Sequence, residues 1–195
     1  MIVGHYATAL VATEKAPRAP FWWLLIASNI ADFVWVLLVA VGIEKVEPSS
    51  MFEATLSNLR IDMTYTHDVL PALGWTLGVG LLAFVIWRDV PTAIWSAILV
   101  AFHEVSDLVS GFHHYIYGPE TARVGLGLYT NAPELALAIE VALGVACVWW
   151  FARSRSRRGM PVSSWGKRWL YGIVIVGPLA QLATARTSLS DLLQM

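Results

Sequence analysis

Long apolar blocks, separated by short polar connections, dominate the pattern of the chain. A helix that crosses a membrane needs about 20 predominantly apolar residues. Five blocks meet or approach that length, at residues 21–43, 69–87, 91–112, 134–152 and 168–185. The last block is shorter and contains Pro178, which favours a kink. Residues 1–13 are apolar but too short to span, so we expect a half-inserted or interfacial helix there. The pattern predicts an all-α, polytopic membrane helix bundle of about five spans, forming one domain over residues 1–195.

Composition agrees with a protein whose main partner is the lipid bilayer. The chain is 57% hydrophobic and 14% charged, whereas soluble domains are roughly 45–50% apolar and about 25% charged. Its tryptophans gather at the ends of the apolar blocks, as in the aromatic belts of membrane proteins. The net charge of −1 argues against a nucleic-acid partner, which would require a basic face. Cys147 is the single cysteine, so no disulfide can form within the chain.

Basic residues predict the orientation of the bundle. They concentrate in the connections around Lys15 and Arg18, at Arg88, and most strongly across residues 153–168. With five spans these three connections fall on one side, and the positive-inside rule makes that side cytoplasmic. The 153–168 loop is therefore expected in the cytoplasm, and residues 44–66 and 113–133 outside.

Several ionisable side chains lie inside the apolar blocks, namely Asp32, His103, Glu104, Asp107 and Glu140. An aspartate, lysine or arginine at a helix centre costs about 2.5–3.5 kcal/mol on insertion scales. The first four blocks contain no lysine or arginine at depth that could neutralise the carboxylates. The acids are therefore either protonated or neutralised by a cation, and metal binding is the simpler explanation.

Histidine spacing supports a metal site. His103 and Asp107 are four residues apart and share a helix face. His114 returns to that face if the helix continues, whereas the adjacent His113 points away. Imidazole and carboxylate ligands suit a divalent transition metal, with zinc first and iron or manganese as alternatives.

Other residues are further candidates for the metal site, and some of them could instead have a purely structural role. At about 1.5 Å per helical residue, Asp32 lies about as deep as His103, and His5 reaches a similar level if the N-terminal helix points inward. His67 is either a ligand or a cap of the second span, and Glu140 either a site residue or a protonated interhelical hydrogen-bonder. Glu104 lies about 100° around the helix from His103, so it is left outside the predicted site.

The order of these residues resembles a family. The chain is similar to the bacterial inner-membrane metal-dependent hydrolases, whose fold is related to zinc-dependent phospholipase C. The resemblance covers roughly residues 4–140 and rests on Gly4-His5, Ile30-Ala31-Asp32, Thr66-His67-Asp68, Phe102-His103-Glu104-Val105-Ser106-Asp107, Gly125-Leu126-Gly127-Leu128-Tyr129 and Glu140.

The chain also departs from the family pattern. Asp68 stands where serine is usual, and Glu104 where tryptophan is usual. A family histidine would fall on Gly111, so its role must pass to His113 or His114. These departures leave room for a different metal or substrate.

The resemblance implies metal-dependent hydrolysis in the inner membrane, for which we expect a phosphoester or lipid-like substrate. The predicted orientation places the site in the outer half of the bilayer. The implied metal ligands are His5, Asp32, His67, His103, Asp107 and His114. Asp68 or Glu140 would act as general base or as an additional ligand.

Two other classes of function remain open. Intramembrane acids and histidines also mark ion or proton relays, although the inner halves of spans two to four are almost wholly apolar. Paired histidines can also bind haem, which would give a red protein with a Soret band.

Overall fold

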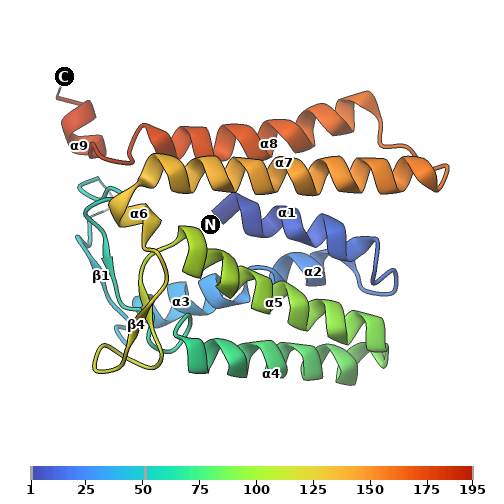
Figure 1. Cartoon of the computed structure of the whole chain (residues 1–195), viewed down its shortest axis with the longest axis horizontal. Helices are drawn as coiled ribbons and strands as arrows, with labels where there is room; N and C mark the ends of the chain where they lie inside the picture. Colours follow the sequence, from blue (N-terminus) through green and yellow to red (C-terminus); the bar gives the residue numbers. More distant parts are fainter. Residues whose placement is uncertain (1, 51, 195) are drawn as a thin grey trace.

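The computed structural model describes residues 2–50 and 52–194, and helices dominate this part of the chain (Figure 1). In chain order its elements are α1 (Ile2–Thr13), α2 (Phe21–Ala27), α3 (Ile30–Ala40), β1 (Val46–Glu47), β2 (Arg60–Ile61), α4 (Val69–Trp87), α5 (Val90–Ser110), β3 (His114–Tyr115), β4 (Arg123–Val124), α6 (Leu128–Asn131), α7 (Pro133–Arg157), α8 (Ser164–Leu182) and α9 (Leu189–Leu192). The strands form two antiparallel pairs, β1 with β2 and β3 with β4.

The long helices run roughly parallel and form layers (Figure 1). α7 and α8 pack together on one side, and α4 and α5 pack together on the other. α1 lies between the layers, with buried alanines in the apolar cores of both. Both strand pairs and α9 gather at one end of the bundle, which we call the loop end (Figure 1). The turns from α1 to α2, α4 to α5 and α7 to α8 lie at the opposite end.

Three helices, α4, α5 and α7, are long and apolar enough to cross a membrane. The pair α2 and α3 passes the same test together, but it bends by 60° at its break, so the expected span at 21–43 is not straight. α8 lies outside this group, because Lys167 and Arg168 make its first turns polar. The described residues therefore contain three candidate spans, or four with the bent pair, and the predicted five are not confirmed.

The basic segment at 153–168 is less of a loop than expected. α7 continues to Arg157, so the connection to α8 is confined to residues 158–163. Glu14 is buried beneath this segment, where it accepts a hydrogen bond from Ser154 and pairs with Arg158 at 3.4 Å. These contacts attach the end of α7 to the end of α1.

A tight hairpin fixes α5 against α4. A Cβ atom on Gly80 would lie 3.0 Å from the Cβ of Ala97, so the glycine permits the close approach of the two helices. Asp89 caps α5 by accepting a hydrogen bond from the amide of Thr92 at 3.0 Å. Arg18 binds the same carboxylate at 3.2 Å. The helix that carries His103 and Asp107 is thus held at its start.

Candidate metal centre

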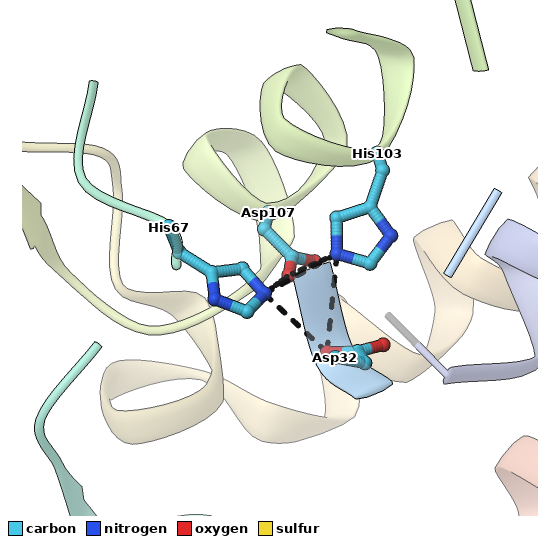
Figure 2. Close-up of side chains that lie close together, drawn as sticks. All are labelled: Asp32, His67, His103 and Asp107. Carbon is cyan, nitrogen blue, oxygen red and sulfur yellow. Dashed lines mark hydrogen bonds and ion pairs between the residues drawn. The ribbon is translucent and has the colours of Figure 1, made fainter. Parts of the chain in front are cut away.

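Four side chains from three parts of the chain converge inside the bundle (Figure 2). His103 and Asp107 project from the same face of α5, one turn apart. Asp32 comes from the first turn of α3, and His67 lies just before α4. One ligand atom from each residue lies within 4.8 Å of those of the other three. We call these four residues the Asp/His cluster.

The distances are those of atoms facing a common point. The Nε2 atoms of His67 and His103 lie 3.3 Å apart. Asp32 Oδ1 is 3.3 Å from the first of these nitrogens and 3.8 Å from the second. Asp107 Oδ2 is 3.9 Å and 3.7 Å from the same two nitrogens. Both imidazoles and Asp107 are buried, while about a third of the Asp32 side chain is exposed.

Hydrogen bonds at the far side of each ring fix which nitrogen faces the cluster. The Nδ1 of His103 lies 2.9 Å from the carbonyl of Ser28, which can only accept, so this nitrogen donates. The Nδ1 of His67 lies 2.9 Å from the hydroxyl of Thr66, which itself donates to the carboxylate of Glu44. Both Nε2 atoms therefore face the cluster, and each can present a lone pair to a cation once it carries no proton.

This arrangement fits a metal ion. Bonds of about 2.0–2.2 Å in a tetrahedral site place neighbouring ligand atoms about 3.3–3.6 Å apart. The observed separations of 3.3–3.9 Å lie at or slightly above that range. Two neutral imidazoles and two carboxylates can bind a divalent transition metal, and the set by itself does not select one element.

In the metal-free chain a proton takes the place of the cation. Burial lowers the pKa of His67, but the hydrogen bond to Asp32 and the charges of Glu104, Asp32 and Asp107 outweigh burial and raise it to about 9. His67 is then protonated at neutral pH, and metal binding must release that proton.

Comparisons with known proteins do not show a family for this chain. Searches of protein-family models, curated proteins and solved structures each found no match. The resemblance to membrane hydrolases therefore rests on the sequence motifs alone.

The break between α2 and α3 contributes directly to the centre. Ser28 and Asn29 separate the two helices, and the carbonyl of Ser28 holds His103. The bend also starts α3 two residues before Asp32, so this carboxylate lies in a first helical turn instead of mid-span. The Ser28 carbonyl, left free by the break, accepts a hydrogen bond from His103, and backbone groups inside a membrane need such partners.

His5 and His114, both predicted ligands, lie beside the cluster and outside the group of four. His5 Nε2 is 3.1 Å from Asp107 Oδ1, and its ring stacks on His103 with centroids 3.7 Å apart. The ring of His114 stacks on that of His67 at 5.8 Å. Burial lowers the pKa of His114 to about 4, with the charge of His67 adding to the effect, so this imidazole is neutral. Neither ring nitrogen of His114 has a hydrogen-bond partner among the described residues.

His114 reaches the centre by a route that the helical spacing did not predict. α5 ends at Ser110 and does not continue through residue 112 or 114, and the histidine is delivered by β3. His113 instead packs on Gly127, whose positive φ and missing Cβ leave room for the ring. Its Nδ1 lies 3.1 Å from the carbonyl of Gly125. Of the two candidates, His114 is the one near the cluster.

The two predicted catalytic carboxylates bind backbone amides. Asp68 accepts hydrogen bonds from Tyr115 and Gly118, which attach the β3–β4 pair to the start of α4. Burial raises the pKa of the Asp68 carboxyl. This residue also lines a polar pocket of about 340 Å³ at the loop end, together with Lys45 and Arg60.

Glu140 anchors the N-terminal helix. Its Oε1 accepts hydrogen bonds from the amides of Val3 at 2.6 Å and Gly4 at 3.1 Å. A carboxylate there complements the positive end of α1. Because His5 follows directly, Glu140 positions the ring that contacts Asp107.

Glu104 is the residue that the sequence reasoning left out. Its side chain is buried, and Oε1 has no hydrogen-bond partner among the described residues. It directly follows His103 on α5, and its charge is one of the causes that raise the pKa of His67. The sequence does place this carboxylate within an apolar span, which is a sign of a functional residue. Its position about 100° around the helix from His103 led us to leave it outside the predicted site.

Proposed function

We propose that the chain is a membrane-embedded, metal-dependent hydrolase that acts on a phosphoester or lipid-like substrate at the loop end of the bundle, with zinc as the first candidate metal. One observation carries the proposal. Two buried imidazole Nε2 atoms and two carboxylate oxygens face one point, and partners behind both rings orient them. A bound cation at that point supplies Lewis acidity, which polarises an ester oxygen and makes water more acidic.

The residues of the chain have distinct tasks in this proposal. The Asp/His cluster holds the cation, while His5 orients Asp107 through its second carboxylate oxygen. Glu104, with one oxygen unpartnered among the described residues, is available to accept a proton. Asp68 and Glu140 act by positioning the β3–β4 pair and α1, respectively.

Metal content is the first test. Protein purified without chelators should contain bound transition metal, and His103→Ala or Asp107→Ala should remove it. His113→Ala is the matched control, because His113 lies against Gly127 and outside the cluster. Metal content near zero in the unchanged chain, or equal content in all three variants, would refute the centre.

Turnover is the second test. Fully metallated protein should hydrolyse a phosphodiester or phospholipid slowly, and chelator or Asp32→Asn should abolish the activity. If metal stays bound but no phosphoester turns over, the hydrolase proposal is wrong and a redox or ion-relay role replaces it. A Soret band in the purified protein would instead indicate haem.

A further inference from the structure

An apolar groove of about 520 Å³ lies between α4 and the bent pair α2–α3. Tyr65 and Ile30 line it towards the loop end, and Trp23 and Leu82 line it towards the opposite end. Gly74 and Gly78 lie between them on α4. A Cβ atom on either glycine would meet no atom within 4 Å, so both border open space.

The groove opens onto a face that no described residue of the chain covers. On α4, Leu73, Leu77 and Leu81 are 56%, 73% and 65% exposed. α4 is also one of the three helices apolar enough to cross a membrane. In a bilayer the groove is therefore surrounded by hydrocarbon, and the material available to fill it is an acyl chain.

The length of the groove matches a single leaflet. Pro71 and Leu82, near its two ends on α4, are eleven residues apart, which corresponds to about 16 Å of helix. The hydrocarbon core of a bilayer is about 30 Å thick, so the groove spans roughly half of it. A lipid from the leaflet at the loop end has its chain at this depth.

The loop end of the groove adjoins the Asp/His cluster. Tyr65 precedes His67 by two residues. Ala27, another lining residue, is bonded to Ser28, whose carbonyl holds His103. A chain in the groove would thus place its attached ester and headgroup at the end where the cluster lies.

We infer that the groove binds one linear acyl chain of a glycerophospholipid, whose phosphoester then lies at the cluster. The inference rests on the proposed function and names its substrate class.

Photo-crosslinking tests the groove without depending on turnover. The full chain is reconstituted in phosphatidylethanolamine–phosphatidylglycerol vesicles containing phosphatidylglycerol with a diazirine in one chain, and adducts are mapped by mass spectrometry. Adducts are expected on the groove-lining part of α4 in metal-loaded and in chelated protein. Gly78→Leu puts a side chain into the open space of the groove, so the adducts on the groove-lining part of α4 should be lost.

Gly172→Leu on α8 is the matched control, because a Cβ there also meets no atom within 4 Å and the site is outside the groove. Its adducts on α4 should be unchanged. Gly74→Leu provides an independent variant, and unchanged metal content shows that the folded site is intact. Equal adduct yield in the variants and the control would overturn the inference.

Further outcomes distinguish failure of the groove assignment from failure of the hydrolase proposal. Loss of adducts in Gly78→Leu with no phospholipid hydrolysis in any preparation would support the groove and refute the hydrolase. Hydrolysis that proceeds undiminished in Gly78→Leu would show that the substrate chain lies elsewhere. A dimer that Gly78→Leu converts to a monomer, or stronger competition by a polyprenyl phosphate than by phosphatidylglycerol, would also overturn the assignment.

Discussion

His67 and His103 owe their orientation to residues that never touch the metal position. Ser28 holds one ring through a backbone carbonyl, whereas the other ring depends on a chain of side chains, from Thr66 to Glu44. Both partners are buried, so water does not readily replace them. Such outer partners commonly affect metal affinity nearly as much as the ligands do.

Thr66→Val should weaken metal binding about 10–100-fold. The substitution keeps the shape of the side chain but removes the acceptor that fixes the His67 tautomer. Competition with a chromophoric chelator measures the affinity. Thr64→Val, in the same loop but bound to Asp62, should leave affinity unchanged. Equal affinity in both variants would show that Thr66 does not orient the imidazole.

At the scale of elements, hydropathy located the apolar helices well but not their interruptions. The predicted blocks at 69–87 and 134–152 correspond to α4 and most of α7. The break at Ser28 and Asn29 lies inside an apolar block, where composition gives little warning, and tertiary contacts with His103 stabilise it. Gly111 directly follows α5 and was the available sign that this helix ends before His114.

Local spacing also determined which residues of the Asp/His cluster could be predicted together from the sequence. His103 and Asp107 could be paired from their spacing on one helix, because that relation is local. Asp32 and His67 could be proposed only from chemistry, since their meeting depends on how α3 and α4 pack. The anchoring contacts of Glu140 are long-range and left no pattern in the sequence.

The start of α1 is held by one distant residue, Glu140. Glu140→Gln should lower the free energy of unfolding by about 1.5–3 kcal/mol, because a charged acceptor for buried amides is lost. Thermal unfolding in detergent measures the effect. Glu134→Gln is the control: its carboxylate is exposed and pairs with Arg186, so little change is expected. An unaltered transition in Glu140→Gln would mean that α1 is held by its apolar contacts.

At the scale of the whole molecule, the two ends of the bundle differ in chemistry. Arg153, Arg155 and Arg157 lie at the end of α7, away from both strand pairs (Figure 1). The polar pocket and the Asp/His cluster lie toward the loop end. The positive-inside rule then predicts that the loop end faces outward.

Cysteine labelling in intact cells tests this orientation. In a Cys147→Ser background, Ser49→Cys should react with an impermeant maleimide, whereas Met160→Cys should react only after lysis. Both native side chains are exposed, so accessibility is matched. Labelling of Met160→Cys in intact cells would reverse the orientation and place the groove in the cytoplasmic leaflet.

The hydrogen bond from the amide of Gly4 to Glu140 also determines the order in which the helices can assemble during synthesis. The two residues are 136 positions apart. At about 5–20 residues per second, the ribosome needs on the order of ten seconds to make the intervening chain. During that interval α1 has been synthesised but Glu140 has not. The helix therefore lacks the hydrogen bonds that hold its start in the bundle. α1 is therefore made before α7 but reaches its final position only after α7 has been inserted, and His5 joins Asp107 only then.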